Sequence, residues 1–236
     1  MFLCLVGTSI RQPRGGDMKK KLLIGLAASV EPDGRGSFRP RYVDTNTKPL
    51  LANARWKGFA SALQAHFAEH LVILGGIELL PHLALPGDTR SIGNPFEQDG
   101  KILREVGSAY ATCHGLVHNY GIEWEKLSYV ETDRNTLGNI GSISHLLLAR
   151  HCAIADAMLS SSHYHIARIS MDMVASGLGS MMIVPAEAFW LATGPKGQRR
   201  EMEEFLRNEF GNSQLTERVI AELNGAADKL NEQYNS

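Results

Sequence analysis

Short apolar runs alternate with longer amphipathic segments along most of the chain. Five runs, bounded by glycine, proline or polar residues, predict buried β-strands at residues 22–28, 70–74, 127–130, 154–159 and 180–184. Strands that alternate with helices form parallel sheets with right-handed crossovers. We therefore predict an α/β fold, a Rossmann-like three-layer sandwich around a mostly parallel five-stranded sheet.

The segments between these strands carry apolar residues at helical spacing. They predict helices at residues 50–67, 101–120, 136–150 and 163–176. Residues 31–47 are rich in glycine, proline and charge and predict a long loop. Residues 77–96 hold three prolines and two glycines. They predict an irregular excursion, which is either a lid over the strand ends or a surface loop.

The pattern divides the chain into three parts. Residues 1–17 read as an extension outside the fold, residues 18–197 as the α/β domain, and residues 198–236 as a helical tail. The tail contains two amphipathic helices, at 198–210 and 213–234. We expect them to pack on the domain, and the alternative is a homodimer contact through the same helices.

The segment 18–29, MKKKLLIGLAAS, has a basic start and a short apolar run, as secretory signals do. We favour its assignment to the first strand, because the sheet needs that strand. The protein is then expected in the cytoplasm, and export is the alternative if the segment is a signal. The chain contains no run of about 18 apolar residues, so we predict no membrane span.

Charge and cysteine content narrow the function classes. The net charge of −1 gives no electrostatic support for nucleic acid or an acidic membrane surface as partner. The three cysteines form no CxxC pair, which argues against a disulfide framework and a cysteine zinc site. We predict no metal.

Two polar loops directly follow the third and fourth predicted strands. The first carries Glu131, Asn135, Thr136 and Asn139, and the second carries Ser160, Ser161, Ser162, His165 and Arg168. Parallel strands present their carboxyl ends at one edge of a sheet, where ligands bind. We therefore expect the two loops to converge on one binding site.

The residue types in these loops favour an anionic or nucleotide-like ligand. The serines, His165 and Arg168 lie at the start of a helix, whose free N–H groups and dipole attract anions. Glu131 suits the hydroxyls of a ribose or the work of a general base. Glu131 and His165 are the candidates for catalysis, although the G-x-S-x-G, G-x-G-x-x-G and Walker A motifs are absent.

The order of short motifs resembles the SanA/ElyC/YdcF-like family, a bacterial α/β domain of largely undefined function. The matching features are Arg55 on the first helix, the pair Gly75-Gly76 after a strand, Gly121-Ile122 after a helix, Glu131 with the Asn-Thr-x-x-Asn element at 135–139, and His165-x-x-Arg168. The chain departs from the family pattern at Gly138, where the family usually has Glu, and at Ile169.

The resemblance implies a Rossmann-like fold and names S-adenosylmethionine as the leading ligand candidate. It adds Arg55, Gly75 and Gly76 to the expected ligand-binding residues, beside Glu131, Asn135, Thr136, Asn139, Ser161, Ser162, His165 and Arg168. Two alternatives remain: a non-catalytic structural or regulatory protein of cell-envelope homeostasis, and a hydrolase or transferase acting on phosphorylated substrates.

Overall fold

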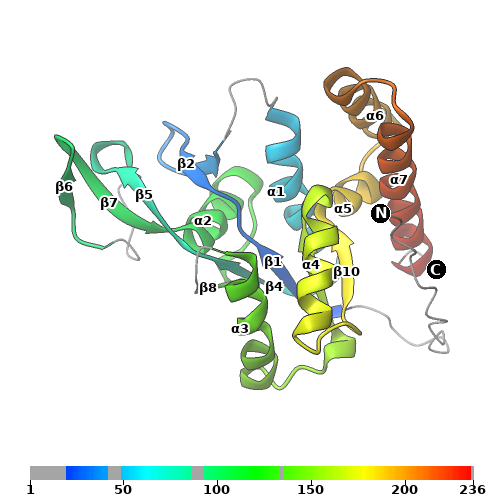
Figure 1. Ribbon diagram of the computed structural model, residues 1–236, viewed down its shortest axis with the longest axis horizontal. Helices are drawn as coiled ribbons and strands as arrows, with labels where there is room; N and C mark the ends of the chain where they lie inside the picture. Colours follow the sequence, from blue (N-terminus) through cyan, green and yellow to red (C-terminus); the bar gives the residue numbers. More distant parts are fainter. Residues whose placement is uncertain (1–19, 42–48, 87–92, 133–134, 235–236) are drawn as a thin grey trace.

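The computed structural model describes residues 20–41, 49–86, 93–132 and 135–234. Its central sheet has five strands, all parallel, in the order β10-β9-β1-β4-β8 (Figure 1). These strands are β1 (Lys20–Leu26), β4 (Ala68–Gly75), β8 (Leu127–Glu131), β9 (Ala157–Ser161) and β10 (Met182–Pro185). The predicted fold class is confirmed, and so is the assignment of residues after Met18 to a strand.

The chain starts in the centre of this sheet and builds it outward in two directions. From β1 it passes through α1 (Pro49–Gln64) to β4 and through α2 (Ser108–Tyr120) to β8. It then crosses by α3 (Thr136–Ala149) to β9, on the other side of β1, and by α4 (His163–Ala175) to β10. The neighbours β1 and β9 therefore flank the switch point, where open α/β sheets bind ligands.

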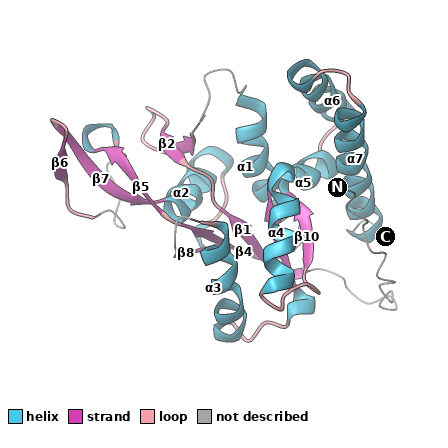
Figure 2. Ribbon diagram, viewed as in Figure 1, coloured by secondary structure: helices cyan, strands magenta, loops and turns pink. Residues whose placement is uncertain are grey.

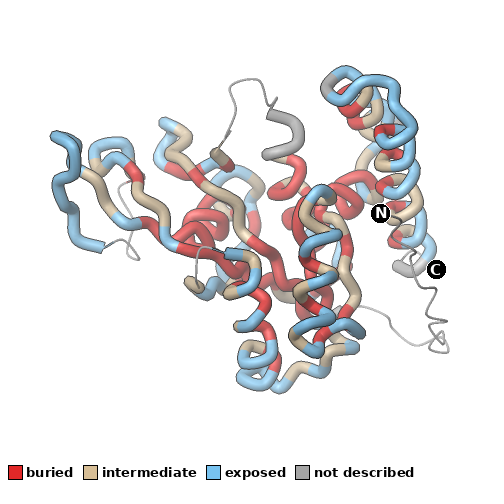
Figure 3. The backbone as a smooth tube through the Cα atoms, in the orientation of Figure 1, coloured by how far each residue is buried: buried red, intermediate tan, exposed pale blue. Residues whose placement is uncertain are grey.

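Helices cover both faces of the sheet (Figure 2). The first face packs against α1, α2 and α5 (Ala186–Thr193), with a core that includes Leu23, Trp56, Phe59, Ile73, Met158 and Phe189. The opposite face packs against α3 and α4, with a core that includes Ile24, Leu74, Ile140, Leu159 and Met173. Figure 3 shows the buried strands between the two helical layers, which make three layers in all.

Two helices after the sheet form a third apolar cluster. α6 (Lys196–Phe210) and α7 (Gln214–Tyr234) pack with α5, and α7 also contacts β10. The buried side chains of this cluster include Trp190, Leu191, Met202, Leu206, Leu223 and Ala227. The tail therefore lies beside the domain at the α5 edge (Figure 1).

The prediction of one helix over residues 101–120 is wrong in its first third. Lys101–Gly107 forms the strand β7, and α2 begins only at Ser108. β7 pairs with β5 (Ile77–Pro81) and β6 (Phe96–Gln98) in a separate antiparallel sheet, at the left of Figure 1. Ile102 and Val106 are four residues apart, a spacing that fits one face of a helix and one face of a strand equally well.

Smaller differences concern the loops. The predicted loop after β1 contains a short hairpin of β2 (Val30–Pro32) and β3 (Phe38–Pro40), and α5 was not predicted. A 3-10 turn at Ile154–Asp156 delays the fourth strand by three residues. The expected extension at residues 1–17 lies outside the described residues. No helix in the described part of the chain is both long and apolar enough to span a membrane.

Gly58 sets how closely α1 and α5 approach each other. A Cβ atom at this position would collide with the backbone carbonyl of Ala186, at the first turn of α5. Gly58→Ala should therefore destabilise the protein by about 2 kcal/mol or more in urea unfolding. Gly141→Ala, on α3, is the matched control: its Cβ would meet nothing within 4 Å, so it should stabilise by about 0.5–1 kcal/mol. Equal effects of the two substitutions would contradict this account.

Candidate functional site

Arg55 on α1 is the centre of a polar cluster at the switch point. Its side chain is buried, with 3% of the residue exposed. The Nε–H group donates to Ser162 Oγ (2.7 Å), Nη1 donates to the carbonyl of Leu26 at the end of β1 (3.4 Å), and Nη2 donates to Tyr164 Oη (3.2 Å). All three acceptors are formally neutral. Within the described residues the guanidinium forms no ion pair.

Three consecutive serines bring β9 into this cluster. Side chains alternate across a strand, so Ser160 faces the same layer as Met158, which packs in the α1 core. Ser162 lies two residues further on and also reaches α1, through Arg55. Ser160, Ser161 and Ser162 are all buried. The Ser160 hydroxyl has no hydrogen-bond partner among the described residues.

The predicted helix N-terminus at α4 is occupied by a carboxylate of the protein itself. Glu187, in the first turn of α5, is 1% exposed, and its Oε2 atom accepts the backbone N–H of His163 (3.0 Å). Ser162 stands at the N-cap position without a side-chain cap bond, because its hydroxyl accepts from Arg55 instead. Burial raises the pKa of the Glu187 carboxyl, and nearby N–H groups and the charge of Arg55 oppose that rise.

His165 and Arg168 lie on the outer side of the cluster. His165 is half-buried and its ring contacts that of Tyr164, with centroids 4.2 Å apart. Burial, reinforced by the charges of Arg55 and Arg168, lowers the pKa of His165 to about 4. Arg168 is mostly exposed, and its Nε atom lies 3.9 Å from Asp172 Oδ2. The structure therefore places Arg55, Ser162, His165 and Arg168 in one region at the carboxyl ends of β1 and β9.

Glu131 has a structural role, because it binds the N-terminus of α2. Its Oε1 atom accepts the backbone N–H of Tyr110 (3.0 Å), at the N-terminus of α2, and its Oε2 atom is buried without a partner in the described chain. Burial raises the pKa of this carboxyl, while the N–H groups of Tyr110 and Ala109 lower it. Gly75, its register partner on β4, has no room for a Cβ beside Ser108. Gly76 accepts the N–H of Ser108 (2.8 Å).

The asparagines after β8 hold the loop in shape. Asn135 caps α3, because its Oδ1 atom accepts the N–H of Gly138 (2.7 Å). Asn139 is buried and its side chain is hydrogen-bonded to Thr132 Oγ1. Thr132 in turn donates its N–H to the carbonyl of Gly75 (2.6 Å). Thr136 is the first residue of α3. These bonds join β4, β8 and α3 into a second polar cluster.

The two clusters occupy the same edge of the sheet but are not adjacent. β4 and β1 lie between β8 and β9, so three strand spacings, about 14 Å, separate the ends of the two strands. The two loops therefore lie at the same edge of the sheet, as predicted, but they do not meet in one binding site. A ligand that touched both clusters would have to lie across the ends of β4 and β1.

Two members of the Arg55 cluster were not predicted. Tyr164 sits between two histidines in the sequence, and Glu187 follows the last strand by two residues. Glu187 resembles Glu131 in its placement, since each acid lies at or shortly after the carboxyl end of a sheet strand. That similarity was a usable signal for a second carboxylate at the strand ends.

Fold and site together define an α/β protein with a Rossmann-like sheet and a buried cation at its switch point. Comparison of the chain with models of known protein families, with curated proteins and with solved structures finds no match. The resemblance to the SanA/ElyC/YdcF-like family therefore stays a prediction.

The low pKa of His165 should appear in the pH dependence of stability. Between about pH 4 and 6.5 the unfolded chain holds a proton that the folded histidine does not. The contribution of His165 to the free energy of unfolding is thus complete above pH 6.5 and is lost as the pH falls toward 4. When the pH falls from 7 to 4, the free energy of unfolding in urea should drop by about 1 kcal/mol more in the wild type than in His165→Gln, after allowance for solvent screening. Parallel profiles would show that the histidine is not desolvated.

Proposed function

We propose that this protein binds a small anionic or nucleotide-like ligand at the carboxyl ends of β1 and β9. The observation that supports this most strongly is Arg55, a buried guanidinium that forms no ion pair within the described residues. Its position at the switch point is where this class of sheet takes ligands.

The energetic argument concerns the charge of Arg55. A buried cation is costly unless an anion and a full set of hydrogen bonds offset the loss of water. Arg55 uses three donors on neutral acceptors, and a guanidinium offers five N–H groups. The remaining donors suit a carboxylate or phosphate, which guanidinium groups bind in bidentate fashion. The Glu187 carboxyl is close enough to interact with the charge of Arg55, but burial raises the pKa of that carboxyl. An anionic ligand would add counter-charge at this point.

S-adenosylmethionine is our leading candidate, on the strength of the family resemblance. In this proposal its carboxylate binds Arg55, and Arg168 attracts it from the exposed side of α4. The unpartnered hydroxyl of Ser160 offers a further hydrogen bond. The nucleoside would then extend across β1 and β4 toward Glu131, whose Oε2 atom is the acceptor left over for a ribose hydroxyl.

The same geometry favours a binding role for this site over a catalytic one. With a pKa of about 4, His165 is neutral at physiological pH and is a weak base there. Glu131 Oε1 is committed to the N-terminus of α2. We therefore assign no reaction, and we treat Arg55, Ser162 and Arg168 as the binding residues.

Removal of the Arg168 side chain should weaken ligand binding without destabilising the fold. Its side chain is 64% exposed and its Nε atom lies 3.9 Å from Asp172 Oδ2, so Arg168→Ala should cost little stability. At about 100 times the dissociation constant, S-adenosylmethionine should stabilise the wild type by about 2.7 kcal/mol in thermal unfolding. A tenfold loss of affinity would reduce this to about 1.4 kcal/mol in the variant.

Arg200→Ala is the matched control. Arg200 is also exposed, lies on α6 and pairs with an acid four residues ahead, as Arg168 does. It should keep the full stabilisation by the ligand. Equal stabilisation of both variants would remove Arg168 from the site. No stabilisation of the wild type by S-adenosylmethionine, nucleotides or sugar phosphates would contradict the proposed function.

A further inference from the structure

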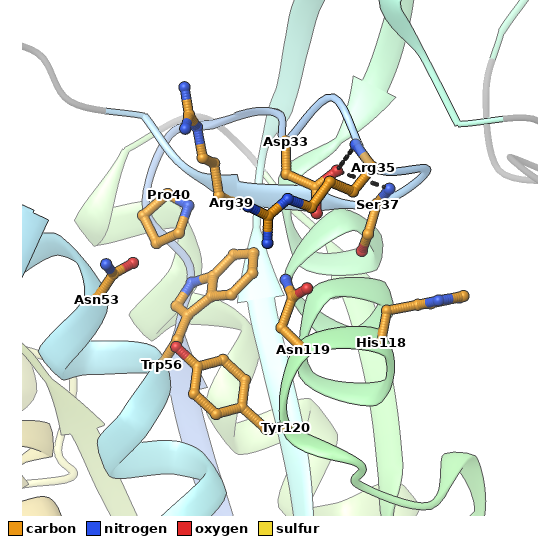
Figure 4. Close-up of a pocket in the computed structure, with 10 residues that line it drawn as sticks. All are labelled: Asp33, Arg35, Ser37, Arg39, Pro40, Asn53, Trp56, His118, Asn119 and Tyr120. Atoms are coloured by element: carbon orange, nitrogen blue, oxygen red, sulfur yellow. Dashed lines mark hydrogen bonds between the residues drawn. The ribbon is translucent and has the colours of Figure 1, made fainter.

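A cavity of about 650 Å³ lies away from the Arg55 cluster. It is open to solvent on one side and is bordered by the β2–β3 hairpin, the first turns of α1 and the end of α2 (Figure 4). Its volume is within the range of small-molecule sites. The residues that line it are Asp33, Arg35, Ser37, Arg39, Pro40, Asn53, Trp56, His118, Asn119 and Tyr120. None of them belongs to the site described above.

The roof of this cavity is held in place by specific contacts. Asp33 Oδ1 accepts the backbone N–H groups of Arg35 (2.7 Å) and Ser37 (3.0 Å), which fixes the turn of the hairpin. The buried Ser37 hydroxyl is hydrogen-bonded to His114 Nδ1 on α2 (3.0 Å). Asn119 donates its amide N–H to the carbonyl of Phe38 (3.0 Å). The hairpin is thus anchored to α2 through its turn and through β3, and it is preorganised.

The floor is an indole with an unused donor. Trp56 is 1% exposed, and its Nε1–H group has no hydrogen-bond partner among the described residues. Gly115 on α2 makes room for this ring, since a Cβ there would collide with it. Buried donors without a partner are uncommon and call for an explanation. An acceptor brought by a ligand would provide one.

The charged lining of the cavity is more cationic than anionic. Figure 4 shows the guanidinium of Arg35 reaching back beneath the hairpin, above the indole of Trp56. Within the described chain the Arg35 side chain forms no ion pair. Arg39 pairs with Glu31 across the hairpin (2.8 Å), and Asp33 is engaged by the turn. The guanidinium of Arg35 and the buried indole of Trp56 therefore line the same cavity.

We propose that this cavity is a second binding site, for a small molecule that carries a phosphate group. The guanidinium of Arg35 would take the phosphate oxygens, as guanidinium groups do. The indole N–H of Trp56 would donate to the same ligand. This inference does not depend on the proposed function, because the two sites share no residue.

Indole N–H resonances of the full chain give a direct test, since there are only three tryptophans. The signal of Trp56 is assigned by its loss in Trp56→Phe. If that variant does not fold, Trp124→Phe and Trp190→Phe assign the signal by elimination. Addition of inorganic pyrophosphate at constant ionic strength should move the Trp56 signal saturably. Arg35→Gln should weaken the apparent affinity about tenfold or more.

Two controls separate this site from other causes. Arg200→Gln, on exposed α6, and Arg168→Ala, in the Arg55 cluster, should both leave the pyrophosphate titration unchanged. A Trp56 signal that does not move, or moves equally in sodium chloride, would overturn the proposal. So would an affinity that Arg35→Gln leaves unaltered.

Discussion

The hydrogen bonds of one buried guanidinium hold the switch point of this sheet together. Arg55 comes from α1, in one helical layer, and it binds the end of β1, the residue after β9 and Tyr164 on α4, in the other layer. The side chain therefore spans the carboxyl edge of the sheet. A charge in this place costs desolvation energy that neutral acceptors only partly offset, which is why we connect its presence with a ligand.

The tail helices are connected to the same region through one polar chain. Glu187 on α5 accepts the backbone N–H of His163, and the His163 ring lies 3.2 Å from Glu222 on α7. Beneath these contacts, the apolar cluster of α5, α6 and α7 reaches Ala54, the neighbour of Arg55 on α1. The tail thus supports the element that carries the buried cation and the element that caps α4.

The sequence predicts the central sheet well because each of its strands is a compact apolar run with turn residues at its ends, although the edge strands β8 and β10 are only partly buried. It does not predict β7, since the four-residue spacing of Ile102 and Val106 satisfies both regular structures. Strand order also has no local signature. For that reason the loops after β8 and β9 were expected to meet, whereas β4 and β1 separate them.

The candidate site is predictable to a similar degree. Its loop residues follow from their place after the strands, and Arg55 follows only from the order of family motifs. The contacts that define its role join residues 107 and 109 positions apart, and no periodicity encodes them. Glu187 was missed because its role depends on the approach of α5 to α4. Side-chain burial, which gives Arg55 and His165 their electrostatic character, is likewise visible only in the fold.

The central claim is that Arg55 is kept buried to bind the anionic group of a ligand. Isothermal titration of the full chain with S-adenosylmethionine and with its decarboxylated form tests this most directly, because the two ligands differ in the carboxylate alone. Our account predicts that the decarboxylated form binds at least about tenfold more weakly, a difference of about 1.4 kcal/mol. Equal affinities, or no binding of S-adenosylmethionine, would contradict it.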